Sequence, residues 1–222
     1  MRSRSRYSLK RLYDVLWEAY GPQGWWPART PTEVAVGAVL TQNTSWRNVE
    51  RAIAALGAAD LLDFRRLHEV EEEALAECIR PAGTFRVKAR RLKALAAWVW
   101  RRSSGSLEAA LRGDGRILRA DLLSVPGIGP ETADAILLYA GNHATFVVDA
   151  YTRRILIRHG WIEPGARYEV IQSQFERVLP SSAEMFNEYH ALLVELGKRH
   201  CRALAQCEGC PLESWPHDAD AS

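Results

Sequence analysis

The sequence predicts an all-α protein on three observations. Apolar residues recur at three- and four-residue spacing along most of the chain, as on one face of a helix. Helix starts such as Thr30-Pro31 and Ser182 precede several of these runs. Strand signals are scarce, and the run 145–148 is the only candidate. In chain order, the predicted helices span residues 8–20, 31–43, 46–57, 67–79, 85–103, 106–113, 117–124, 131–141, 150–159, 167–179 and 184–200.

The order of these helices predicts two lobes. A central bundle of residues 30–140 would carry a helix-hairpin-helix over 117–141, and the second lobe would combine 1–29 with 141–222. At 222 residues and 47% hydrophobic content the chain can bury one or two cores. No segment approaches the ~20 apolar residues of a membrane span, and Met1–Arg6 does not lead into an apolar signal core. We therefore expect a cytoplasmic protein with no membrane partner.

A proline-glycine hairpin lies between two of the predicted helices. Val125-Pro126-Gly127-Ile128-Gly129 lets the chain reverse tightly, and its glycines expose peptide N–H groups that phosphate oxygens can reach. The helix beginning near Pro130 adds free N–H groups and the positive end of its dipole. Taken alone, PGIG also fits an ordinary helical hairpin.

Asp149 follows the apolar run 145–148 and precedes the predicted helix 150–159. An aspartate there is an ordinary N-cap, and it can cap a helix while one oxygen points elsewhere. Arg153, Arg154 and Arg158 follow at helical spacing and could hold phosphates beside the carboxylate. An acid in basic surroundings suits stabilisation of a sugar cation and activation of water, as in glycoside cleavage.

The net charge of +2 is small, but charge is segregated along the chain. Acidic residues crowd one predicted helix and basic residues the next, which fits either solvated helix faces or a groove of focused charge. The acidic set is Glu69, Glu71, Glu72, Glu73 and Glu77, and the basic set is Lys88, Arg90, Arg91, Lys93, Arg101 and Arg102.

Three cysteines cluster near the carboxyl end of the chain. Cys201, Cys207 and Cys210 form C-x5-C-x2-C, whereas Cys78 stands alone and is most simply a core residue. In a cytoplasmic chain, metal binding explains such a cluster better than disulfides do.

The hairpin segment LLSVPGIGPETADAIL, the VVDAYTRR segment and the terminal CRALAQCEGCPL together resemble the endonuclease III superfamily of DNA base-excision glycosylases. This helix-hairpin-helix superfamily carries a Gly/Pro-rich loop and an essential aspartate. The resemblance covers roughly residues 8 to 212. It implies a two-lobed helical glycosylase fold, Asp149 as the catalytic acid, damaged double-stranded DNA as the partner of a monomer, and a monovalent cation at the hairpin when DNA is bound. It implies DNA contacts from Gln42, Asn43, Val125, Gly127, Ile128, Gly129, Glu131, Thr132, Arg153 and Arg154.

One position departs from the bifunctional members of this superfamily. Their hairpin reads G-hydrophobic-G-x-Lys-Thr-Ala, and the lysine amine attacks the sugar, whereas Glu131 stands at that position here. A carboxylate cannot form a Schiff base. The resemblance therefore implies a monofunctional N-glycosylase without abasic-site lyase activity.

Three segments of the amino-terminal half carry a narrower resemblance: Trp25-Trp26-Pro27, Gly37–Trp46, and Cys78–Phe85 followed by Lys88 and Arg90-Arg91-Leu92. They resemble the subgroup of endonuclease III-related proteins that includes the bacterial 3-methyladenine DNA glycosylases. Because an N3-methylated purine is cationic, it stacks well on electron-rich indoles. Trp25, Trp26, Pro27 and Trp46 are the predicted base pocket, although a Trp-Trp pair is also common in cores. Gln42 is the expected wedge into the gap that an extruded base leaves, with a simple helix C-cap as the alternative.

The predicted function is thus removal of a damaged base, an alkylated purine such as 3-methyladenine. One rival is a glycosylase for mismatched or oxidised bases, and the other is a non-catalytic DNA-binding module. Relatives with a 4Fe-4S cluster carry a fourth cysteine about six positions beyond the third, where this chain has Pro216 and His217. Either His217 or an external ligand completes a cluster, or the cluster has been lost and the three thiols are packing residues.

Overall fold

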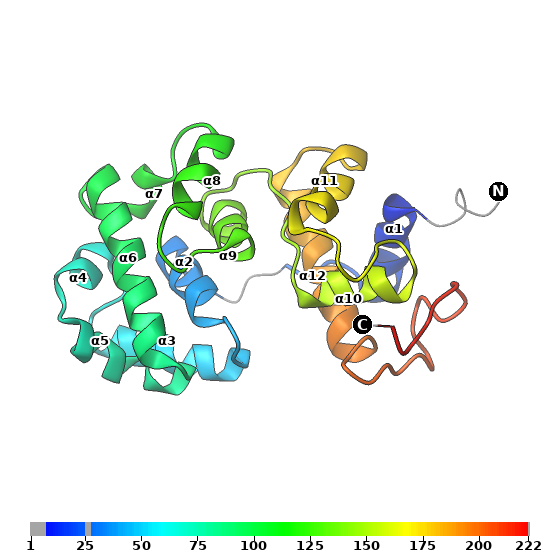
Figure 1. The fold of residues 1–222 in the computed structure, drawn as a ribbon, viewed down its shortest axis with the longest axis horizontal. Coiled ribbons are helices and arrows are strands. Elements are labelled where there is room, and N and C mark those ends of the chain that lie inside the picture. The colour runs from blue at the N-terminus through cyan, green and yellow to red at the C-terminus, as the bar shows by residue number, and fades with distance from the viewer. Residues whose placement is uncertain (1–7, 25–27, 222) are drawn as a thin grey trace. The chain divides into compact units, whose positions relative to one another are not determined.

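The computed structural model describes residues 8–24 and 28–221, and within these ranges it is helical with no β-strand. The all-α prediction is confirmed (Figure 1). The chain divides into two compact units, Met1–Trp25 with Ala144–Ser222, and Trp26–His143. The sequence placed these divisions at 29/30 and 140/141. Over the described residues, no helix combines the length and the apolar character that a bilayer crossing requires.

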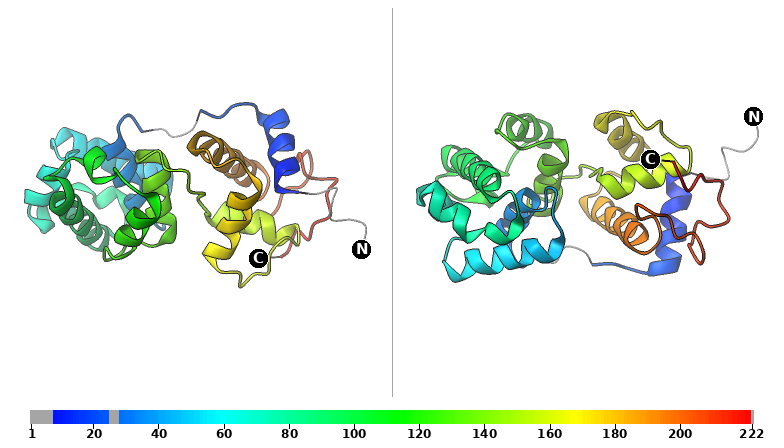
Figure 2. Two further views of the ribbon diagram at one scale, coloured as in Figure 1. Left: turned by 90° about the horizontal axis from the view of Figure 1, so that it is seen from above. Right: turned by 60° about the horizontal axis from the view of Figure 1, so that its bottom comes forward.

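The discontinuous unit contains the helices α1 Leu9–Tyr20, α10 Ala150–Arg158, α11 Tyr168–Val178 and α12 Ala183–Arg199. Helix α12 packs against both α1 and α10, as Figures 1 and 2 show. The core of this unit is aromatic: the ring of Phe146 stacks on Phe175 at 3.9 Å, and Phe186 and Tyr189 contact the Phe146 ring edge-on. The Tyr189 hydroxyl also donates to the Leu9 carbonyl at 2.6 Å, which ties α12 to α1.

The continuous unit is built around a buried helix. Its elements are α2 Pro31–Leu40, α3 Trp46–Ala58, α4 Phe64–Glu69, α5 Glu72–Cys78, the 3-10 turn Arg80–Ala82, α6 Phe85–Ser103, α7 Leu107–Ala110, α8 Gly115–Leu123, α9 Pro130–Ala135 and the π-helical turn Ile136–Ala140. Every residue of α2 from Val34 to Leu40 is buried. A helix that is apolar all round belongs in the centre of a core. Thr30 caps α2 by accepting a hydrogen bond from Glu33 N at 3.1 Å.

The predicted helix 67–79 is wrong, because it is two helices. Val70 and Glu71 are extended between α4 and α5. The ammonium group of Lys93 donates to the carbonyls of His68 and Val70, both at 2.6 Å. These bonds satisfy backbone groups that the break leaves outside a helix.

The run 145–148 forms no strand. Instead, side chains of α11 satisfy its backbone: Glu176 accepts from Phe146 N at 2.9 Å, and Gln172 donates to Phe146 O at 2.8 Å. The predicted helices 31–43 and 106–113 end earlier than expected, at Leu40 and Ala110. The predicted helix 131–141 changes to a π-helical turn after Ala135.

The basic run is not one surface groove. The Lys88 side chain is buried, and its Nζ donates to Leu40 O at 2.9 Å and to Ala82 O at 2.6 Å. It therefore caps the end of α2 and the 3-10 turn from inside the core. Lys93 is likewise committed to backbone carbonyls, so the two lysines of the run serve the fold.

Candidate functional site

The predicted hairpin connects α8 to α9. Val125 and Ile128 are buried and anchor it, and Ile128 N donates to Val125 O at 3.0 Å. Gly127 has φ +83, a conformation that favours glycine, and a Cβ there would lie 2.4 Å from Arg91 Cγ. Gly129 has an extended backbone and precedes Pro130, the first residue of α9. The hairpin thus needs glycine at 127 for two independent reasons.

The structure brings Gln42 to this hairpin. Its amide nitrogen donates to Thr132 Oγ1 at 2.9 Å and lies 3.4 Å from Gly127 O, while its amide oxygen accepts from Arg91 Nη1. Gln42 is therefore anchored across a sequence gap of 85 to 90 residues. No sequence signal links Arg91 to the hairpin, because the two are neighbours only in the folded unit. Asn43, next along the chain, has φ 55 in the left-handed region.

Two residues at the start of α9 differ in environment. Glu131 is exposed in the first helical turn, where the positive end of the helix dipole stabilises a negative charge. Thr132 is buried and receives the Gln42 hydrogen bond. Further along α9, Asp134 is fully buried and accepts two hydrogen bonds from Arg119, at 2.7 and 3.0 Å. This bidentate pair ties α9 to α8 beneath the hairpin.

Only one member of the predicted base pocket is described. Trp46 begins α3, is half-buried, and its indole nitrogen donates to Glu50 Oε1 at 3.1 Å. Trp25, Trp26 and Pro27 lie outside the described residues. The base pocket therefore stays a prediction.

Asp149 is the N-cap of α10. Its Oδ1 accepts a hydrogen bond from Thr152 N at 2.7 Å, and its side chain is 13% exposed. Its Oδ2 lies 3.7 Å from Nε2 of His190, a buried residue of α12. No sequence pattern singles out His190, because a histidine within an apolar helix is most often a core residue. Burial lowers the pKa of His190, and the Asp149 charge opposes this more weakly.

The three arginines after Asp149 contact backbone carbonyls of the same unit. Arg153 Nη1 donates to Ala166 O at 2.6 Å, and Arg154 Nη1 donates to Cys201 O at 3.0 Å. The suggestion that Arg158 holds phosphate is wrong. Its side chain is buried and donates to Cys201 Sγ and to the carbonyls of residues of the carboxyl-terminal segment, namely Arg202, Ala203 and Ala221.

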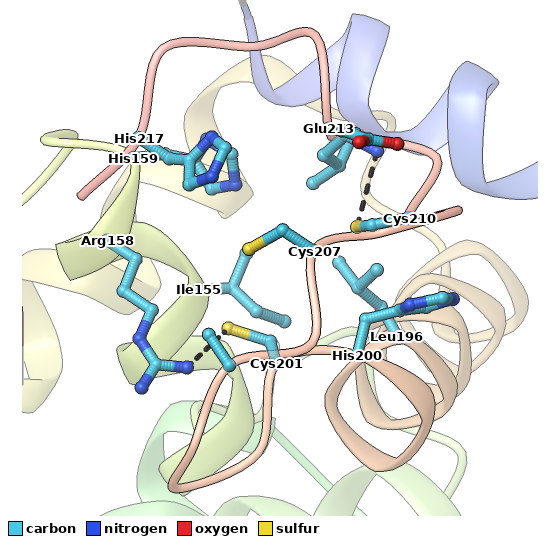
Figure 3. Close-up of a pocket in the computed structure, with 12 residues that line it drawn as sticks. Ile155, Arg158, His159, Leu196, His200, Cys201, Cys207, Cys210, Glu213 and His217 are labelled. Carbon is cyan, nitrogen blue, oxygen red and sulfur yellow. Dashed lines mark hydrogen bonds between the residues drawn. The ribbon is translucent and has the colours of Figure 1, made fainter. Parts of the chain in front are cut away.

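The clustered cysteines line a cavity of about 20 Å³ (Figure 3). Arg158 donates to Cys201 Sγ at 3.3 Å, and Leu212 N lies 3.4 Å from Cys210 Sγ. Burial raises the pKa of the Cys210 thiol. His217 lines the same cavity, and its Nδ1 is 2.7 Å from Trp215 O.

This donor set does not fit a four-cysteine cluster. The cavity holds about one water molecule. Within 8–24 and 28–221, no group of three His, Cys, Asp or Glu side chains is arranged to hold a metal ion. Two side chains hold this carboxyl-terminal loop by hydrogen bonds. Arg158 donates to Arg202 O at 2.7 Å, and His159 Nδ1 is 3.0 Å from Pro216 O. The loop therefore has direct contacts that hold it in place.

Comparison with known proteins gives consistent matches. Residues 36–181 match the model of a family described as HhH-GPD superfamily base excision DNA repair protein. A Methanocaldococcus jannaschii protein, provisionally described as a DNA repair glycosylase, is 48% identical over 93% of this chain and 94% of its own length. The fold is similar to that of H. pylori 3-methyladenine DNA glycosylase bound to 1,N6-ethenoadenine, with TM-score 0.75, 28% identity, and coverage of 87% of this chain and 98% of that chain. It is also similar to that of endonuclease III in a non-covalent DNA complex, with TM-score 0.80, 22% identity, and coverage of 97% and 96%.

Proposed function

Because the chain belongs to the HhH-GPD superfamily and is a base-excision DNA glycosylase of that family, we propose that it is a monofunctional enzyme for alkylated purines. The family membership confirms the resemblance drawn from the hairpin and the VVDAYTRR segment. In the proposed reaction a monomer bound to double-stranded DNA extrudes the damaged base and hydrolyses its N-glycosidic bond.

The single observation that carries the monofunctional proposal is Glu131. It occupies the hairpin position of the lysine nucleophile in bifunctional relatives, and its carboxylate cannot form an imine with the sugar. In the same unit the lysines are Lys88 and Lys93, and each donates to two backbone carbonyls. Burial and the neighbouring Arg91 lower the pKa of Lys88, but its amine is enclosed in the core. These contacts support the proposal that neither lysine of this unit replaces the missing amine nucleophile at the hairpin.

Asp149 is the proposed catalytic acid. An ionised carboxylate stabilises the positive charge that develops on the sugar as the base departs, and it can orient the attacking water. Its N-cap bond uses Oδ1, which accepts a hydrogen bond from the backbone N–H of Thr152 at 2.7 Å. The hydrogen bond therefore ties one carboxylate oxygen to the start of α10.

The proposed substrate class follows from leaving-group chemistry. An alkylated purine such as 3-methyladenine is cationic, so it departs without strong acid catalysis and stacks favourably on indoles such as Trp46. The likeness to the H. pylori 3-methyladenine glycosylase supports this choice. The second candidate is a glycosylase for mismatched or oxidised bases, which the similarity to endonuclease III sequences favours.

The test is a panel of duplexes that each carry one defined lesion. We expect release of the alkylated purine, with strand breaks appearing only after alkali treatment. Release of mismatched or oxidised bases in preference would support the second candidate. Strand cleavage without alkali, together with borohydride trapping, would overturn the monofunctional assignment. Tight DNA binding without release from any duplex would favour a non-catalytic module.

A further inference from the structure

His190 faces the carboxylate of Asp149 from the neighbouring helix. The distance from His190 Nε2 to Asp149 Oδ2 is 3.7 Å, and the two side chains are only 5% and 13% exposed. Both residues belong to the same compact unit, and α10 packs directly on α12. Their proximity is thus a property of one core.

The packing of α10 on α12 holds this distance. A Cβ at Gly197 would lie 2.3 Å from Tyr151 Cδ1, so the two helices approach too closely for any side chain there. Tyr189, which directly precedes His190, is fully buried, and its hydroxyl donates a hydrogen bond to Leu9 O of α1. His190 therefore sits on a segment with little freedom to shift relative to Asp149.

The protonation state of His190 suits an orienting role. Burial lowers the pKa of the imidazole, and the attraction of the Asp149 charge is the weaker influence. Near neutral pH the ring is accordingly neutral, with one N–H to donate. A neutral donor can orient a carboxylate without cancelling the negative charge that stabilises a sugar cation, whereas an imidazolium would oppose that stabilisation.

A carboxylate needs more than one contact to be oriented. The terminal torsion of an aspartate is soft, so the Thr152 N–H bond to Oδ1 leaves the plane of the group free to turn. A second contact on the Oδ2 side would fix that plane. The 3.7 Å separation exceeds a hydrogen bond, and such contacts in unliganded sites commonly tighten in the complex.

We propose that His190 is a positioning residue for Asp149, holding Oδ2 through its Nε2 while the Thr152 amide holds Oδ1. This inference rests on the proposed function, in which Asp149 is the catalytic acid. The proposal gives α12 a part in the reaction, in addition to the hairpin and Asp149. His190 does not touch the substrate in this proposal and acts only through the carboxylate.

The kinetic test compares three substitutions at one position. In His190→Gln the amide nitrogen can replace Nε2, in His190→Asn it reaches only the position of Nδ1, and His190→Leu has no donor. In single-turnover base release, we expect about a 10- to 100-fold loss for Leu and Asn, and recovery to within about fivefold of wild type for Gln. DNA affinity should be unchanged in all three. Adding His190→Leu to Asp149→Asn should cause no further loss, because the group it positions is gone.

Thermal unfolding and a spectroscopic measurement control for a purely structural role. If His190→Leu does not fold, the Asn and Gln variants still decide, since both keep a buried amide of similar polarity. NMR titration of the labelled His190 ring tests the contact without catalysis: Asp149→Asn should lower the pKa of His190, because an attracting anion is removed.

The two arms separate the failure of this inference from failure of the proposed function. If wild-type protein releases no base, the proposed function fails, and the NMR titration still decides whether the two groups interact. Release by His190→Leu at the wild-type rate would overturn the positioning role. An unchanged His190 titration in Asp149→Asn would overturn the contact itself.

Discussion

Replacing Asp149 by Asn or by Ala separates its two roles, helix cap and charged group. Asparagine caps helices about as well as aspartate, so the bond to Thr152 N, 2.7 Å long, can be retained. We expect Asp149→Asn to lose only the charge near the helix N-terminus, about 0.3–1 kcal/mol of stability. Asp149→Ala also loses the cap, which costs about 0.5–2 kcal/mol. For a chain of this length each kcal/mol lowers the melting midpoint by about 2–4 °C.

Activity should not follow these stability differences. Both variants lack the carboxylate, so base release should fall at least about 100- to 1,000-fold in each, the loss typical of a single group that stabilises developing charge. DNA affinity should stay equal or rise, because removing the Asp149 charge removes its repulsion of the DNA phosphates. Single-turnover base release, fluorescence anisotropy with lesion duplex and thermal unfolding measure the three quantities. Wild-type turnover in Asp149→Asn, or activity that tracks melting midpoint across both variants, would refute the assignment.

Four further predictions concern the hairpin, the missing amine, the cysteine cavity and a buried histidine. Gly127→Ala should destabilise the protein by about 1–3 kcal/mol, because φ is +83 and the added Cβ meets Arg91. Gly129→Ala is the matched control for stability, since Gly129 has an extended backbone and nothing within 4 Å of an added Cβ; equal losses of stability in both variants would contradict this explanation. Glu131→Lys should gain weak borohydride trapping on lesion DNA, whereas trapping of equal strength in the unmodified chain would show that another amine serves. Chelator treatment should leave the melting midpoint unchanged, because hydrogen bonds fasten the carboxyl-terminal loop; stoichiometric iron with loss of folding on chelation would contradict this. Burial lowers the pKa of His190 below its ordinary 6.5, so the folded state favours the neutral ring. The stability that this residue contributes is therefore present above pH 6.5 and is lost as the pH falls below that value. Urea unfolding should show that the free energy of unfolding falls less steeply with acid in His190→Gln than in wild type.

Local signals predicted most of the helices. Thr30 and Ser182 cap α2 and α12 by accepting hydrogen bonds from Glu33 N and Met185 N, and such caps are visible in sequence because the side chain and its partner are three residues apart. The hairpin was predicted for the same reason, since its glycines and proline are contiguous. Asp149 was recognised as a helix cap, which the structure shows, while its catalytic role stays a prediction.

Long-range contacts account for the errors. At the break between α4 and α5, the carbonyls of His68 and Val70 accept hydrogen bonds from Lys93, more than 20 residues away, and such a long-range contact is not visible in the local sequence. Basic side chains are rarely buried, so sequence patterns predict surface positions for Lys88 and Arg158, yet each is buried and donates to carbonyl groups of distant segments. The approach of His190 to Asp149 likewise requires α10 and α12 to be packed first. Sequence patterns report the helix that a residue belongs to, but not its partner on another helix.

The division of the chain has a consequence for the order in which it folds during synthesis. Helix α1 emerges first, but its partner α12 is made last, and the bond from Tyr189 to Leu9 joins residues 180 positions apart. The unit Trp26–His143 is continuous and can fold while the remainder is still being translated. The unit that carries Asp149 must instead wait for its final helix. Until then the apolar face of α1, with Leu12 and Leu16, lacks its main packing partner, so a ribosome stalled before α12 would hold a nascent chain with part of that face open to chaperones.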